Sequence, residues 1–461
     1  MLSRASASDF SQGSVASNIL RLAVPMTFAQ LINVLYNVVD RIYLGHMPGA
    51  SAGALAGVGL AFPIITMITA FANLFGYGGT PLFSIARGKN DTADAGCIMG
   101  ATCSLLLGTG LVLSAICFLF KTPLLYAFGA SDATYPYAND YLTIYLCGTL
   151  FVMLSLGMNG FINAQGFGRT GMMTVLLGAV VNIALDPLFI FSFDLGVRGA
   201  ALATVLSQFL SAAWAMYFLC GRRAVIRLRL SQMRPHLRQT LRIVTLGSSG
   251  FIMSVTNGLV QIACTSTLQR FGGDVYVSVM TIVNSVREVA LTPLNGVTQA
   301  AQPVLGYNYG ACQYGRVRRG IRFMTVLSIL YTLVTWLVIF LFPQFFAGLF
   351  TSDAQLAADS IPAMHIYFFG IFMMALQFSG QSVAVALGRS KQSIFFSLFR
   401  KVVIVIPLTL LLPYIPSLGV NGVFLAEPIS NFIGGGACYI TMLLTIGREM
   451  TRKESAKIAQ I

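Results

Sequence analysis

Charged residues are scarce in this sequence, and that scarcity excludes most soluble proteins. Only 10% of the 461 residues are Asp, Glu, Lys or Arg, whereas a typical soluble domain carries about 25%. Hydrophobic residues make up 56% of the chain. Such a composition is typical of a protein that crosses the lipid bilayer several times.

Residues that carry out catalysis or bind metals are also few or scattered. The three histidines fall in separate loops or at the edges of apolar segments, and the eight cysteines form no Cys-x-x-Cys pair. No Ser-His-Asp or Cys-His arrangement stands out, and no Gly-Lys-Ser/Thr follows a glycine-rich stretch. We therefore expect no enzyme, no nucleotide site and no resident cofactor.

Apolar runs of about 20 residues, long enough to cross a bilayer as helices, recur along the whole chain. They predict an all-α membrane protein with twelve spans, near residues 19–44, 53–80, 95–120, 137–158, 165–191, 197–219, 241–267, 275–300, 320–345, 361–385, 393–413 and 420–446.

The net charge of +14 is distributed unevenly between these spans. With the loops assigned to alternate sides, one side receives 24 of the 29 basic residues, including the seven arginines from Arg222 to Arg242 and the run from Arg389 to Lys401. Basic loops stay in the cytoplasm, so we predict a multi-pass protein of the plasma or inner membrane with both termini cytoplasmic. A nucleic-acid partner is not expected, because the 222–242 segment is better explained as a linker lying on anionic lipid.

The sequence also contains an internal duplication. Similar stretches recur in the same order at a nearly constant separation, slightly less than half of the chain: Phe128-Gly-Ala-Ser-Asp132 and Phe350-Thr-Ser-Asp353, Gly148 and Gly370, Gly168-Arg169 and Gly388-Arg389, Leu195-Gly-Val-Arg-Gly199 and Leu418-Gly-Val-Asn-Gly422, Pro81 and Pro303. Six spans in each half give both halves the same orientation, as in transporters built from parallel repeats. We predict an N-lobe at 1–220, a basic cytoplasmic linker at 221–240, a C-lobe at 241–446 and a cytoplasmic tail at 447–461.

Two acids in the predicted N-lobe form a candidate ion site. Asp40 shares a helix face with Tyr36 and Asn37, although a pair with Arg41 at the membrane interface would explain it equally well. Asp186 lies at a similar depth in the fifth span, about 25 Å of rise beyond Arg169, with Asn182 one turn earlier. Carboxylates at this depth are costly unless they bind a proton, a cation or a cationic ligand, so the pair predicts a site for H⁺ or Na⁺.

The C-lobe offers candidates for substrate binding. Glu288 lies well inside the eighth span beside Arg287, and adjacent helical residues have different partners. Glu427 lies near the start of the last span. These acids, Arg287 and the glutamines Gln261 and Gln377 either line a polar cavity or serve as structural hydrogen-bonding groups between helices.

Proline and glycine mark two further features of the spans. Pro25 removes a backbone hydrogen bond inside the first span, which predicts either a hinge or a static kink. Gly76, Gly78 and Gly79 lie within a span and predict close helix packing rather than a phosphate loop.

Several stretches resemble the multidrug and toxic compound extrusion (MATE) transporters, in particular their MepA-like branch. The most specific is Gln302-Pro-Val-Leu-Gly-Tyr-Asn-Tyr-Gly-Ala311, continuing to Tyr314-Gly-Arg316; others are Asn37-Val-Val-Asp-Arg-Ile-Tyr-Leu-Gly-His46, Asn163-Ala-Gln-Gly-Phe-Gly-Arg169, and Asn182 with Asp186. The resemblance implies two six-helix lobes in a V around a central cavity. It also implies export of amphipathic, often cationic compounds in exchange for H⁺ or Na⁺ by alternating access.

The resemblance further implies roles for single residues. An N-lobe cation site would fall on Asp40, Asn182 and Asp186, with Tyr36, Asn159 and Thr204 as additional members. Branches with an acid in the seventh or tenth span differ from this sequence, which has Gln261 and Gln377 near there, so Glu288 is the candidate acid in their place. We expect a monomer with small drugs and lipid as its partners.

A lipid-linked oligosaccharide flippase of similar topology is the alternative. Its anionic cargo calls for several basic residues inside the spans, and Arg41 and Arg287 are the two candidates that the sequence suggests. At least three acids stand against them, so cationic cargo is favoured.

Overall fold

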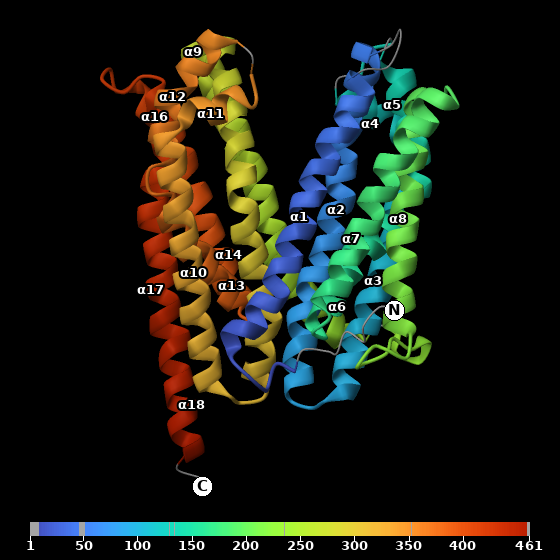
Figure 1. Cartoon of the computed structure of the whole chain (residues 1–461), viewed down its shortest axis with the longest axis vertical. Helices are drawn as coiled ribbons and strands as arrows, with labels where there is room; N and C mark the ends of the chain where they lie inside the picture. The colour runs from blue at the N-terminus through green and yellow to red at the C-terminus, as the bar shows by residue number, and fades with distance from the viewer. Residues whose placement is uncertain are drawn as a thin grey trace. The chain divides into compact units, whose positions relative to one another are not determined.

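The computed structural model of the chain is built from helices (Figure 1). It describes residues 9–45, 51–128, 130–132, 134–234, 236–351 and 353–458. Within these ranges the side chains of residues 37, 38, 41, 42, 44, 45, 51–56 and 456–458 are not described. Within these ranges there is no strand, so the predicted all-α fold is confirmed.

The described chain divides into two compact units. The first contains Val24–Gly247, and the second contains Phe10–Ala23 together with the residues after Gly247. Helix α1 (Val15–Gly45) contributes to both. The other elements before the second unit are α2 (Ser51–Gly88), α3 (Thr92–Leu119), α4 (Lys121–Ala127), α5 (Tyr135–Cys147), α6 (Thr149–Ala164), α7 (Gly168–Pro187), the π-helical η1 (Leu188–Ser192), α8 (Gly196–Cys220) and the short 3₁₀ turn η2 (Leu230–Gln232).

The second unit is interrupted more often by π-helical segments. Its elements are α9 (Leu237–Gly310, whose first residues belong to the first unit), α10 (Tyr314–Leu341), α11 (Pro343–Gly348), α12 (Ala354–Phe368), α13 (Ile371–Ala386), α14 (Ser390–Leu398), η3 (Phe399–Val405), α15 (Ile406–Leu411), η4 (Leu412–Tyr414), α16 (Asn421–Ser430), η5 (Asn431–Gly435), α17 (Gly436–Met442), η6 (Leu443–Gly447) and α18 (Arg448–Ile458).

The described helices account for the predicted spans. Nine are long and apolar enough to cross a membrane, and two pairs, α5 with α6 and α12 with α13, reach that length and hydropathy together, with bends of 57° and 49°. Helix α9 has 74 residues, more than twice the length one crossing needs, and it is broken at Gly273. Large apolar side chains such as Leu111, Leu330 and Val334 remain exposed along the spans, as expected of surfaces that face lipid.

The backbone carries the duplication more clearly than the sequence does. Left-handed residues recur as two pairs with identical separation in the chain, Asn90 with Cys312 and Gly166 with Gly388. The two bent helix pairs break at Gly148 and at Phe369-Gly370, and these two glycines have that same separation. The predicted pairing of Gly168 with Gly388 is therefore wrong, because Gly388 shares its positive φ with Gly166.

The glycines of α2 confirm the predicted close packing. A Cβ at Gly78 would overlap the carbonyl oxygen of Ile243, and one at Gly76 would meet the backbone of Gly157 at 3.0 Å. Gly79 faces Thr102 and Phe161. Hydrogen side chains at these positions let the helices of the first unit approach to backbone contact.

The basic linker folds back onto the first unit. Ile226 N–H donates to Gln165 Oε1 over 3.0 Å, and the Ser104 hydroxyl donates to the carbonyl of Met233. Gln232 lies against α3, where Gly96 and Gly100 leave no room for a Cβ. The segment is therefore packed against α3 and α6.

The stretch that carries the family resemblance fastens the start of the chain to the second unit. Asn308 donates to the carbonyl of Phe10 over 3.2 Å and accepts from Arg316 Nε over 2.8 Å. Arg316 also donates to the carbonyls of Phe10, Gln12 and Gly13 at 2.9, 3.2 and 2.8 Å. The Asn308–Arg316 pair therefore forms a clamp on residues 10–13.

Candidate functional site

Asp40 and Asp186 lie together in the first unit, as their predicted depths suggested. Their carboxyl groups, from α1 and α7, are within hydrogen-bonding reach of each other. Asp186 is 0% exposed and Asn182 is 1% exposed. Asn182 Nδ2 donates to Asp186 Oδ1 over 3.4 Å, as their one-turn spacing on α7 allows.

Three tyrosines surround this pair of acids. Tyr36, one turn before Asp40 on α1, interacts electrostatically with Asp40, Asp186 and Tyr145. Tyr141 and Tyr145, one turn apart on α5, are 5% and 4% exposed. Tyr141 is within hydrogen-bonding reach of Thr204 on α8, so four helices contribute to one polar cluster.

The cluster has more acceptors than donors. Oδ2 of Asp186 and Oδ1 of Asn182 are buried, and neither accepts a hydrogen bond from any described residue. Two carboxylates in contact repel each other unless a proton or a cation lies between them. The oxygen-rich arrangement therefore suits H⁺ or a hard cation such as Na⁺. The described residues contain no group of three or more His, Cys, Asp or Glu that could hold a metal ion.

Four further residues predicted for the N-lobe lie in α1 and α6: Pro25, Asn37, Arg41 and Asn159. Asn159 on α6 is half-buried, and its Oδ1 has no hydrogen-bond partner in the described part of the chain. The side chains of Asn37 and Arg41 lie outside the described residues. Pro25 is buried within the continuous helix α1.

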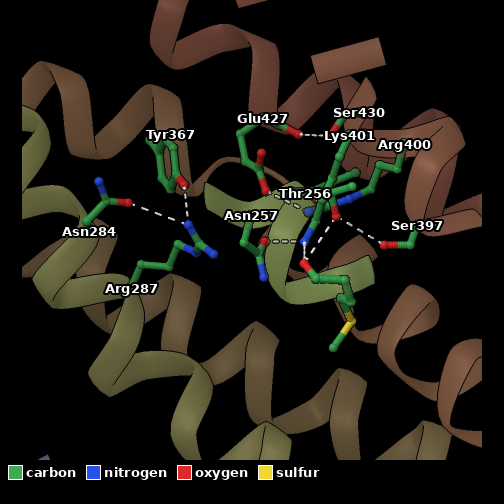
Figure 2. Close-up of polar contacts among 12 residues, drawn as sticks. Thr256, Asn257, Asn284, Arg287, Tyr367, Ser397, Arg400, Lys401, Glu427 and Ser430 are labelled. Carbon is green, nitrogen blue, oxygen red and sulfur yellow. Dashed lines mark hydrogen bonds and ion pairs between the residues drawn. The ribbon is translucent and has the colours of Figure 1, made fainter. Parts of the chain in front are cut away.

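The second unit contains a polar cavity of about 320 Å³. Arg287 and Gln261 from α9, Tyr367 from α12 and Glu427 from α16 line it, together with Asn257, Asn284, Cys264, Thr409, Arg400, Lys401 and a few apolar residues. Figure 2 shows several of these polar side chains pointing toward one another from separate helices.

Glu427 is paired inside this cavity. Arg400 Nη2 donates to Glu427 Oε1 over 3.0 Å, and the side chains are 3% and 9% exposed. Arg400 also donates to Asn431, and Lys401 donates to Asn257 and, over 3.2 Å, to the carbonyl of Met253. The network holds two basic residues of η3 in the interior of the unit (Figure 2).

Arg287 interacts electrostatically with Glu427 but makes its hydrogen bonds to other residues. It donates to Tyr367 Oη over 3.2 Å and to Asn284 Oδ1 over 3.5 Å. Asn284 in turn donates to Gln261 Oε1 over 3.0 Å. No carboxylate of the described residues lies within 4.0 Å of the Arg287 guanidinium.

The remaining C-lobe candidates are not brought into the cavity. Gln377 on α13 is 4% exposed, and its Oε1 has no hydrogen-bond partner among the described residues. Glu288 is exposed and is not among the residues that line the cavity. Of the predicted C-lobe residues, Arg287, Gln261 and Glu427 therefore share one site.

Sequence reasoning missed the basic character of this cavity. Arg400 and Lys401 were assigned to a cytoplasmic loop, but they are 2% and 4% exposed within the apolar segment Ser390–Tyr414. Arg41 and Arg287 were thus not the only basic candidates inside the spans. The sequence did contain a signal for their burial, because both residues lie well within the predicted span 393–413.

Comparisons with known proteins agree with this fold. The MatE family model matches residues 25–188 and 250–411. The multidrug export protein MepA of Staphylococcus saprophyticus is 23% identical over 399 residues, covering 86% of this chain and 87% of that protein. A solved outward-facing multidrug resistance MATE family transporter of the MOP superfamily is 22% identical with a TM-score of 0.89, over 97% of this chain and 98% of that one.

A MOP superfamily transporter from Pyrococcus furiosus, described by the reverse polarity of its binding pocket, is similar to the same degree. It is 23% identical with a TM-score of 0.89, over 96% of this chain and 98% of that one. The two segments matched by the family model make up more than half of the chain. The protein therefore belongs to the MatE family of multidrug and toxic compound extrusion transporters.

Proposed function

We propose that this protein exports amphipathic, often cationic compounds across the plasma membrane in exchange for H⁺ or Na⁺. The contact between the carboxyl groups of Asp40 and Asp186 carries the proposal. Asp186 is buried and Asp40 is half-buried; two acids in contact at such a site are stabilised by a cation, and a membrane gradient can supply one. The name of the staphylococcal relative, a multidrug export protein, supports export of drugs rather than uptake.

Alternating access links the ion to the cargo in this proposal. Asp40 and Asp186 take up the cation from outside, and neutralisation removes their mutual repulsion. Tyr36 and Asp40 then rearrange with the outer part of α1, and Pro25 is where α1 bends, because the backbone hydrogen bond missing there lowers the resistance to bending. Cargo leaves outward and the cation is released inward.

Ethidium efflux tests the proposal. Inverted membrane vesicles or proteoliposomes containing the full chain are given a pH gradient or a Na⁺ gradient separately. Efflux driven by one gradient identifies the coupling ion. Efflux driven by neither contradicts antiport, and translocation of a fluorescent lipid in the same vesicles would then favour the flippase alternative.

A further inference from the structure

The cavity of the second unit has an excess of positive charge. Arg287, Arg400 and Lys401 line it, and Glu427 is the one acid among its lining residues. Guanidinium groups stay protonated in proteins. The cavity therefore carries a net charge of about +2 with Lys401 protonated, and about +1 with Lys401 neutral.

This positive charge is only partly compensated, because Glu427, the one acid among the residues that line the cavity, interacts with all three basic residues. Arg400 is tied to Glu427 and Asn431, but its Nε is buried and donates to no described residue. Arg287 uses Nη1 for Tyr367 and Asn284, both neutral partners. Arg287 also interacts electrostatically with Glu427, but that carboxylate is already paired with Arg400. One acid thus faces three basic residues, and an anion in the cavity would offset the remaining cost of burying them.

The duplication relates this cavity to the acidic cluster of the first unit. At the separation that relates Gly166 to Gly388, Tyr145 corresponds to Tyr367; at the separation that relates Gly196 to Gly419, Thr204 corresponds to Glu427. The two basic residues of η3 have small counterparts, since Arg400 corresponds to Gly178 and Lys401 to Ala179. The same region of the repeat therefore carries an excess of acid in the first unit and an excess of base in the second.

Resting on the proposed function, we infer that this cavity binds the carboxylate of a small organic anion that the protein exports. Arg287 is its main partner, since the planar guanidinium fork matches a carboxylate and its remaining donors are unused by the described residues. Asn257, Gln261 and Asn284 offer further polar contacts.

The size and lining of the cavity define the rest of the ligand. About 320 Å³ lies at the lower end of the range of about 300–1,000 Å³ seen for ligand pockets. Val260, Met280, Val405 and Val423 supply an apolar wall. A monocarboxylate with a compact apolar body fits both features, whereas an oligosaccharide headgroup exceeds the volume.

Binding of benzoate to the purified full-length protein tests the inference. Benzamide and benzylammonium serve as neutral and cationic probes of similar shape, with affinities measured by calorimetry in the same detergent. We expect benzoate to bind at least about tenfold more tightly than either probe, because a charge-assisted hydrogen bond is stronger than a neutral one. Equal affinity for benzoate and benzamide would overturn the inference.

Two substitutions change the affinity in opposite directions. Arg287→Gln should weaken benzoate binding about tenfold or more, because it removes the charged donor. Glu427→Gln should tighten binding several-fold, because it removes the competing acid and leaves Arg400 available. A gain in affinity cannot result from misfolding and would support the inference. An unchanged or weakened affinity contradicts it when Glu427→Gln still shows a cooperative melting transition.

The inference and the proposed function fail separately. Ethidium efflux driven by an ion gradient, with no benzoate binding, would overturn the anion site and leave the antiporter proposal intact. Benzoate binding that responds to both substitutions, with no gradient-driven ethidium efflux, would support the anion site and contradict the export of cations.

Discussion

Arg400 and Glu427 form a 3.0 Å ion pair between η3 and α16, with side chains 3% and 9% exposed. Removing one member of such a pair leaves the other charge buried and uncompensated, at a cost of about 3–5 kcal/mol. Arg400→Met should therefore lower the melting temperature strongly. The double variant Arg400→Met/Glu427→Gln should recover much of the loss, and a double variant no more stable than Arg400→Met would show that the pair is not the cause.

Asp186→Asn should abolish coupled export without unfolding the protein. The amide keeps the shape of the carboxyl but takes up no proton and carries no negative charge to attract a cation, so gradient-driven ethidium efflux should fall about tenfold or more. Asp140→Asn is the matched control, since Asp140 pairs with Arg198 at an exposed position, where ion pairs contribute little. Full efflux by Asp186→Asn under both gradients would refute the coupling role.

Pro25→Ala separates a hinge from a static kink. The substitution restores a backbone hydrogen bond to α1, and an interior proline costs about 3 kcal/mol in a helix. We expect a higher melting temperature together with slower ethidium efflux. Pro63→Ala on α2, also inside a helix but exposed, should leave efflux unchanged; equal efflux in wild type and Pro25→Ala would favour the static kink.

Gly78→Ala should disturb the first unit because its Cβ would overlap the carbonyl oxygen of Ile243. Overpacking of this kind costs about 1–3 kcal/mol. Gly59 lies on the same helix with nothing within 4 Å of its Cβ position. Gly59→Ala should therefore leave the melting temperature unchanged or raise it slightly, because alanine is more favourable than glycine in a helix by up to about 1 kcal/mol of free energy. Similar melting temperatures for the two variants would contradict the packing role of Gly78.

Arg316→Lys should loosen the start of the chain. Arginine donates here to the Asn308 side chain and to three backbone carbonyls, and the three donors of an ammonium cannot reproduce the planar fork. A loss of about 1.5–3 kcal/mol per charged hydrogen bond would expose residues 10–13. Limited proteolysis should cut this segment faster than in Arg318→Lys, whose arginine pairs with Glu454; equal cutting rates would argue against the clamp.

The fold was predictable because long apolar runs admit few structures in lipid. Most predicted spans start or end within a few residues of a helix end, although the helices ending at Gly88 and Gly310 run eight and ten residues further, and the break at Gly273 separates the two spans predicted within α9. The Asp40–Asp186 contact could also be predicted, because the sequence assigns both residues to one predicted six-span half at similar predicted depth. Tyr141 and Tyr145 were missed, since a tyrosine in an apolar span does not reveal which neighbours its hydroxyl meets.

The basic cavity was not predicted because charge was assigned by loop rather than by depth. Counting Arg400 and Lys401 as cytoplasmic strengthened the topology argument and concealed a buried network. Sequence alone also gave no partner for Arg287, whose contacts Tyr367 and Asn284 depend on how α9 and α12 pack. Helix packing decides such contacts, and the periodicity of a single span does not encode it.

The packing of the linker after α8 bears on how a duplicated chain of this kind evolved. When a gene is copied and fused in tandem, the joint starts as surplus sequence that either copy can lose. Here Gln232 packs against Gly96 and Gly100, and the backbone N–H of Ile226 donates to Gln165 Oε1. The joint has become part of the structure of the first half, so a split-protein experiment should keep residues 221–236 on the first fragment.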